Sequence, residues 1–134
     1  MDRVRKFLVL SASEKLLLVV AGVLFSVFSV TLRVGSLEAS EVFARRLARL
    51  GLSRWSVEKA EWAFSVIESC RLESGGCLPA AMVGLAIIDD LPELRIGVRA
   101  GEATIEAHAW LECTDGKLLY MGDDPTEFRR LDEK

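Results

Sequence analysis

Three cysteines and a single histidine are the residues of this chain that could support covalent chemistry. Cys77 follows the pair Gly75-Gly76 and precedes an apolar run of helical length, 78–88, while His108 lies downstream. A thiol becomes an effective nucleophile when a neighbouring base takes its proton, and imidazole is the usual base in cysteine chemistry. A cysteine enzyme with this sequence would therefore have to pair its thiol with His108.

Cys77 is the thiol best placed to be the nucleophile. In the first turn of a helix a thiol faces unpaired backbone N–H groups and the positive end of the helix dipole, and both favour the thiolate. Pro79 supports a helix start here, because proline is tolerated in the first turn. Gly75 and Gly76 would let a peptide approach closely, and the Cys77 N–H could bind an oxyanion. The alternative is that Cys77 packs as a small hydrophobic residue.

The other two thiols fit structural roles better. Cys113 is five residues from His108 on the same predicted strand, and an odd separation places two side chains on opposite faces. Cys113 falls on the apolar face of that strand. Cys70 lies near the end of a predicted helix, where the dipole favours cations over thiolate.

A third catalytic residue depends on the turn that follows the His108 strand. Asp115-Gly116 predicts a tight hairpin, and a two-residue turn pairs 114 with 117 and 108 with 123. Asp123 would then face His108 and fix the orientation of its imidazole. A turn one residue longer would change the register and favour Asp124, or leave Glu112 in this role. On strand parity alone His108 could instead be an ordinary half-exposed residue.

The elements that must position these residues are helices first and a small antiparallel sheet second. Helical patterns cover 16–32, 38–50 and a stretch ending near Cys70, in which Trp55, Trp62 and Val66 would line one face. After the 78–88 run, alternating strands follow at 94–99, 104–113 and 117–121. This order predicts an α+β fold, a helical amino-terminal half followed by a small antiparallel sheet, in a single domain 1–134. Its helical region would be 1–60 and its core 61–134.

Residues 16–32 are the most ambiguous segment of the chain. They contain no charge, Ser13-Glu14 offers a helix start, and the length is at the lower limit for a membrane span of about 20 residues. Serine and threonine residues within the segment favour a buried or partner-facing helix. A membrane span is the alternative, and no small-residue cleavage site for a signal sequence follows clearly.

Charge and composition limit the classes of partner. Residues 1–60 carry ten Lys/Arg against five Asp/Glu, and residues 61–134 carry seven against fifteen. The basic half lacks interleaved aromatics and nucleic-acid motifs, so nucleic acid is not an expected partner. Neither a zinc spacing nor a phosphate loop is present, and we expect no metal or cofactor. Unevenly spaced cysteines indicate a reducing compartment, so we expect a cytoplasmic protein, with membrane association through 16–32 as the alternative.

Four segments together resemble one family. GGCLPAAMVGLAI, LRIGVR, EAHAWLE and DGKLLYMGDDPTEFRRL, in this order, are similar to the stand-alone leader peptidases of lasso-peptide biosynthesis. These belong to the transglutaminase-core cysteine peptidases, so the resemblance implies a transglutaminase/papain-like core. The chain departs from the family at Pro79-Ala80-Ala81, where a longer polar residue is common, and at Gly122-Asp123, where Asn-Asp is common.

The resemblance implies a Cys-His-Asp peptidase that removes the leader from a ribosomally made precursor. Cys77 would be the nucleophile, His108 the base and Asp123 the acid. The implied partners are the precursor leader, a small leader-recognition protein and the downstream cyclase. Two other hypotheses remain: a non-catalytic transglutaminase-like module that binds a peptide or partner, and an enzyme that passes its acyl group to an amine.

Overall fold

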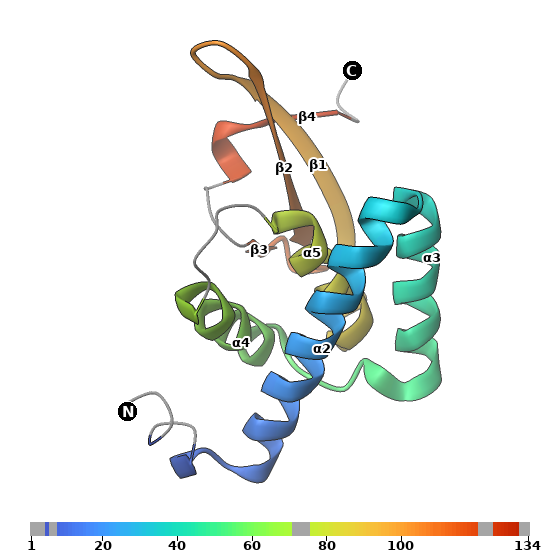
Figure 1. Ribbon diagram of the computed structural model, residues 1–134, viewed down its shortest axis with the longest axis vertical. Coiled ribbons are helices and arrows are strands. Elements are labelled where there is room, and N and C mark those ends of the chain that lie inside the picture. The colour runs from blue at the N-terminus through green and yellow to red at the C-terminus, as the bar shows by residue number, and fades with distance from the viewer. Residues whose placement is uncertain (1–4, 6–7, 71–75, 121–124, 132–134) are drawn as a thin grey trace.

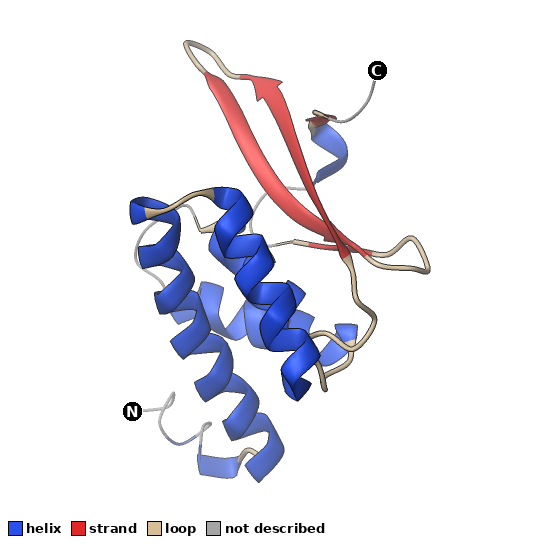
Figure 2. Ribbon diagram, turned by 90° about the vertical axis from the view of Figure 1, so that its right-hand side faces the viewer, coloured by secondary structure: helices blue, strands red, loops and turns tan. Residues whose placement is uncertain are grey.

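A helical half and a small sheet make up the fold (Figures 1 and 2). The computed structural model describes residues 5, 8–70, 76–120 and 125–131. The described elements are α2 (Ala12–Val34), α3 (Leu37–Leu47), the π-helical turn η1 (Ala48–Leu52), α4 (Val57–Cys70), α5 (Cys77–Ile87), β1 (Glu93–Ala100), β2 (Ile105–Glu112), β3 (Leu118–Leu119), the 3-10 turn η2 (Pro125–Glu127) and β4 (Arg129–Arg130). Helices followed by an antiparallel sheet confirm the predicted α+β class.

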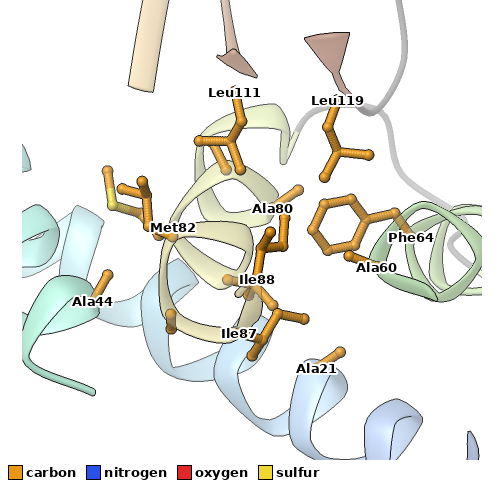
Figure 3. Packing of buried hydrophobic residues seen from close by; sticks show 14 of the residues in the cluster. Ala21, Ala44, Ala60, Phe64, Ala80, Met82, Ile87, Ile88, Leu111 and Leu119 are labelled. Atoms are coloured by element: carbon orange, nitrogen blue, oxygen red, sulfur yellow. The ribbon is translucent and has the colours of Figure 1, made fainter. Parts of the chain in front are cut away.

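Helix α5 is the centre of the hydrophobic core. Eight of its 11 residues, 80–87, are buried. Figure 3 shows apolar side chains approaching it from every side: Ala21 from α2, Ala44 from α3, Phe64 from α4, Leu111 from β2 and Leu119 from β3. A helix that is apolar all round must be enclosed in this way to keep its surface from water.

Serine side chains cap the amino ends of α2, α3 and α4, which precede α5 in the sequence. Ser11 Oγ accepts a hydrogen bond from the Glu14 N–H at 3.2 Å, so α2 begins earlier than the predicted start at Ser13. Ser36 caps α3 in the same way, and Ser56 accepts from the third N–H of α4. Each cap satisfies an N–H group that has no partner within its own helix.

Trp55 does not belong to the helical face on which it was expected. It lies before α4, where its N–H donates to the Ile87 carbonyl at 3.0 Å and its carbonyl accepts from the Asp89 N–H at 2.9 Å. These hydrogen bonds attach the backbone at Trp55 to the carboxyl end of α5. The buried face of α4 is formed by small residues and one phenylalanine, Ala60, Ala63 and Phe64.

The sheet has the strand order β3-β2-β1-β4, with neighbouring strands antiparallel. Its long strands β1 and β2 pair over their full length, from Glu93 opposite Glu112 to Ala100 opposite Ile105. Residues 105–107 are exposed, because this end of the hairpin extends beyond the helices (Figure 1). Strand β4 was not predicted from the sequence, since two arginines carry no alternating pattern.

Close packing between α5 and β2 makes a prediction about Gly84. A Cβ atom at this position would lie 2.3 Å from Cδ1 of Leu111, a side chain that is itself fully buried. We expect Gly84→Ala to lower the free energy of unfolding by about 1–3 kcal/mol, because the core is already full. Denaturant unfolding followed by circular dichroism measures this change.

Gly22→Ala in α2 is the matched control. A Cβ atom there has no atom of the described residues within 4 Å, so the substitution should stabilise the protein by roughly 0.5–1 kcal/mol through helix propensity. Equal stability of the two variants would contradict the packing described for α5.

Candidate active site

Cys77 is the first residue of α5, as predicted. Gly76 precedes it as the N-cap with φ of 103°, a left-handed conformation that glycine adopts without strain. The first backbone bond of the helix runs from the Ala80 N–H to the Gly76 carbonyl at 3.0 Å. The Cys77 side chain is half-buried and packs against the edge of the core.

The first turn of α5 presents backbone donors beside this thiol. The N–H groups of a first helical turn have no partner within the helix. Gly76 has no side chain with which to cap them, and Pro79 has no N–H group at all. The N–H groups of Cys77 and Leu78 are therefore the ones that could bind a developing oxyanion.

His108 lies on β2, and it is 6 % exposed. The interpretation of His108 as a half-exposed strand residue is therefore wrong. Its ring centroid lies 4.9 Å from that of Phe128 and 6.0 Å from that of Trp110. These two aromatic contacts restrict the rotation of the imidazole.

Phe128 contacts both the His108 ring and a cluster of charged side chains. The guanidinium of Arg99 lies 4.5 Å from the Phe128 ring centroid, at cation–π distance. Arg99 also forms ion pairs with Glu106 and Glu127, and these hold it over the ring. Neither Phe128 nor Arg99 was identified from the sequence as part of the site. The one available signal was a lone phenylalanine in a polar carboxyl-terminal segment.

Helix α5, which begins with Cys77, packs against strand β2, which carries His108, on the face of the strand opposite to that of the His108 position. The contact is made through Leu111, which lies against Gly84. His108 occupies the alternate set of strand positions, and its described ring contacts are with Trp110 and with Phe128 from the carboxyl-terminal segment.

The structural role predicted for Cys113 agrees with its surroundings. Cys113 is buried, and burial together with the nearby Asp90 carboxylate raises the pKa of its thiol to about 11. Such a thiol is almost entirely protonated at neutral pH and is a poor nucleophile. Cys70 is the last residue of α4, as expected, and its side chain lies outside the described part of the structure.

The predicted two-residue turn is wrong. Cys113 and Lys117 are bonded across a three-residue loop in which Gly116 has φ of 86°. The described pairs are Leu111 with Leu119 and Glu112 with Leu118, one residue away from the predicted register. This removes the premise that placed Asp123 opposite His108. Asp123 and Asp124 themselves lie outside the described residues.

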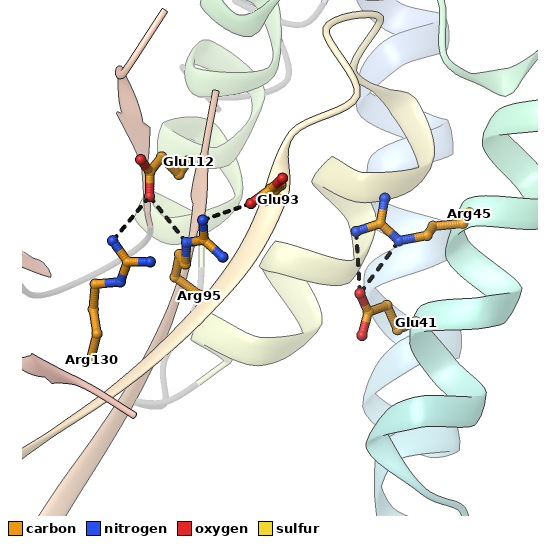
Figure 4. Close-up of polar contacts among 6 residues, drawn as sticks. All are labelled: Glu41, Arg45, Glu93, Arg95, Glu112 and Arg130. Atoms are coloured by element: carbon orange, nitrogen blue, oxygen red, sulfur yellow. Dashed lines mark hydrogen bonds and ion pairs between the residues drawn. The ribbon is translucent and has the colours of Figure 1, made fainter. Parts of the chain in front are cut away.

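Glu112, the other candidate acid, is engaged elsewhere. Its Oε2 atom lies 3.1 Å from Arg95 Nε and 3.6 Å from Arg130 Nη1 (Figure 4). Arg95 is also paired with Glu93. This network connects β1, β2 and β4, so Glu112 serves to hold the sheet together.

Asp90 fixes the loop that sets the register. Its two carboxylate oxygens accept hydrogen bonds from the backbone N–H of Thr114 at 2.9 Å and from its hydroxyl at 2.6 Å. The side-chain hydrogen bond from Thr114, followed by the backbone one, lowers the pKa of Asp90. The end of α5 is thereby attached to the loop between β2 and β3.

Comparison with known proteins identifies the superfamily. The model of the transglutaminase-like superfamily matches residues 16–132, which include both the helices and the sheet. The chain belongs to the transglutaminase-like superfamily. This superfamily includes cysteine peptidases. No curated protein and no solved structure matches the chain.

The different environments of the thiols predict selective alkylation. At pH 7 iodoacetamide should modify Cys77 in the folded protein, whereas Cys113 should remain unmodified because it is buried and protonated. Peptide mapping by mass spectrometry after timed quenching measures each site. Labelling in denaturant, where both thiols should react, is the control. Equal labelling of Cys77 and Cys113 in the folded protein would contradict this assignment.

The Asp90 contact predicts a pH-dependent contribution to stability. A carboxyl whose pKa is lowered by folding stabilises the folded state above its unfolded pKa, and this stabilisation is lost as the pH falls through the folded pKa. Asp90→Asn should therefore lower the denaturation midpoint at pH 7. Its difference from the wild type should shrink as the pH falls below the ordinary carboxyl range. If the midpoints of Asp90→Asn and the wild type differ by the same amount at pH 7 and below the ordinary carboxyl range, the Asp90 charge has no such role.

Proposed function

We propose that the chain is a cysteine peptidase that removes the leader peptide from a lasso-peptide precursor. The observation that carries the proposal is the position of Cys77, half-buried at the start of the central helix of a transglutaminase-like fold. His108 on the adjoining strand supports it, as the only histidine of the chain. The lasso-peptide substrate rests on the sequence resemblance described above.

The proposed reaction proceeds through a thioester. His108 takes the proton of the Cys77 thiol, and the thiolate attacks the scissile carbonyl while N–H groups at the start of α5 bind the oxyanion. His108 then donates a proton to the leaving amine, which departs with the core peptide. Water, deprotonated by His108, hydrolyses the thioester, releases the leader carboxylate and restores the thiol.

Asp123 is the proposed orienting acid on the family resemblance alone, since the observed register no longer places it opposite His108, and Asp124 is the alternative. Glu112 is disfavoured as the orienting acid, because its carboxylate is paired with Arg95 and Arg130. An acid that only orients the imidazole contributes less to the rate than the nucleophile does, by roughly one to two orders of magnitude. Asp123→Asn should accordingly retain more activity than any change at Cys77.

The proposed partners follow from the substrate. A leader-recognition protein would bind the precursor and present its cleavage site to Cys77, and the freed amine would pass to a separate cyclase. The non-catalytic binding module and the acyl transferase are the alternatives. Product masses distinguish hydrolysis from transfer to an amine, because transfer adds the mass of the amine and not that of water.

Substitution of Cys77 and His108 tests the activity. Cys77→Ala should lower precursor cleavage by at least about a thousandfold, because the nucleophile is removed. His108→Phe should have a similar effect, and it keeps an aromatic ring between Phe128 and Trp110 so that folding is retained. Mass spectrometry of the precursor, incubated with the chain and the recognition protein, measures cleavage.

Cys113→Ala is the matched control, since it removes a buried thiol directly after the strand that carries His108. It should retain cleavage. Wild-type turnover in folded Cys77→Ala or His108→Phe would overturn the proposed mechanism, and absence of cleavage by the wild type would favour the binding module.

A further inference from the structure

Helix α2 exposes an apolar face along its whole length. Its 23 residues make it long and apolar enough to cross a membrane. One side packs into the core through Leu17, Ala21 and Phe28. The opposite side carries six exposed apolar residues, which we call the α2 stripe: Leu16, Val19, Val23, Val27, Val30 and Val34. A solvated helix would carry polar side chains on this side.

The α2 stripe is straight. From Leu16 to Val34 the chain advances 18 residues in five steps, a mean of 3.6, which is the period of an undistorted α-helix. The stripe therefore stays on one side of α2 for about 27 Å.

Helix α3 extends this surface. It lies antiparallel beside α2 (Figures 1 and 2), and the Phe28 and Phe43 rings are in contact at 5.9 Å. Val34 and Phe43 line one shallow cavity where the two helices meet. Val42, which is 63 % exposed, lines a neighbouring cavity together with Phe43 and Arg46.

The exposed charges beside this apolar surface are mostly positive. Among the described residues of α2, α3 and η1, four charged side chains are exposed, namely Arg33, Glu38, Arg46 and Arg49. Three of the four are arginines. An apolar helix face bordered by arginines is the pattern by which helices lie in the interface of anionic bilayers.

We propose that α2 and α3 dock the protein on an anionic lipid surface, with the α2 stripe in the plane of the interface. The apolar side chains of the α2 stripe, such as Val19, enter the boundary of the acyl region, and Arg33 and Arg46 contact the headgroup phosphates. The helix does not span the bilayer, because Leu17, Ala21 and Phe28 are held in the protein core. This surface is separate from Cys77 and does not depend on the proposed peptidase activity.

Vesicle flotation with the full chain tests the proposal. The protein should bind vesicles of phosphatidylcholine with phosphatidylglycerol, and bind pure phosphatidylcholine much more weakly. The double variant Val19→Gln, Val30→Gln should lower binding at least about tenfold, because two apolar side chains no longer enter the acyl region. Arg33→Gln and Arg46→Gln should each lower binding to anionic vesicles roughly fivefold.

The matched control changes two exposed apolar residues elsewhere. Ile105→Gln, Leu131→Gln alters side chains that are 77 % and 64 % exposed, against 54 % and 59 % for Val19 and Val30. It should bind vesicles as the wild type does. Near-ultraviolet circular dichroism and precursor cleavage without lipid should be the same in all variants, which separates this surface from the active site.

Three results would overturn the proposal. The first is equal loss of vesicle binding in the stripe variant and the control. The second is an absence of vesicle binding by the wild type. This result counts equally if sedimentation equilibrium shows a monomer or a dimer that the stripe variant abolishes. The third is retention of the wild type in membranes after carbonate extraction, which would show that α2 spans the bilayer.

Discussion

Enclosure of α5 is the constraint on which the rest of the structure depends. Eight consecutive residues of this helix are buried, so apolar side chains must cover it on all sides. Helices α2, α3 and α4 cover part of its surface, and strands β2 and β3 cover another part (Figure 3). Only its ends remain for other contacts. The carboxyl end is bonded to the Trp55 segment, and the amino end carries Cys77. Packing therefore leaves the thiol half-buried at the edge of the core.

The two faces of the sheet make different contacts. Its apolar positions, represented by Leu111, pack against α5, while the alternate positions carry His108 and Trp110. This second face is covered by Phe128, which Arg99 holds in place from its other side. Trp110 fits because Gly97 of β1, which pairs with His108 and lies diagonally from Trp110, has no side chain, since a Cβ atom there would lie 2.7 Å from the indole. The imidazole is thus positioned by residues that come from three separate segments of the chain.

Periodicity and end signals in the sequence predict the elements well, but they do not determine long-range contacts. The apolar run after Cys77 predicted α5, and strand parity predicted that Cys113 faces the core. Trp55 was placed on a helix because its spacing to Trp62 matched a helical face, yet hydrogen bonds to α5 hold it outside. The hairpin register failed because Asp115-Gly116 suits both two- and three-residue loops, and Asp90, far away in the sequence, holds the longer one. The aromatic cover of His108 was missed because β4 and η2 are too short to have a period.

The central claim is that Cys77 at the start of α5 forms a covalent acyl intermediate. The most direct measurement is the mass of the intact chain, quenched in acid during turnover of the precursor with the recognition protein, followed by mapping of the modified residue. The account predicts a thioester between the leader carbonyl and Cys77 that accumulates early and then disappears as free leader forms. Cleavage that proceeds with no adduct, or with an adduct on a different residue, would contradict it.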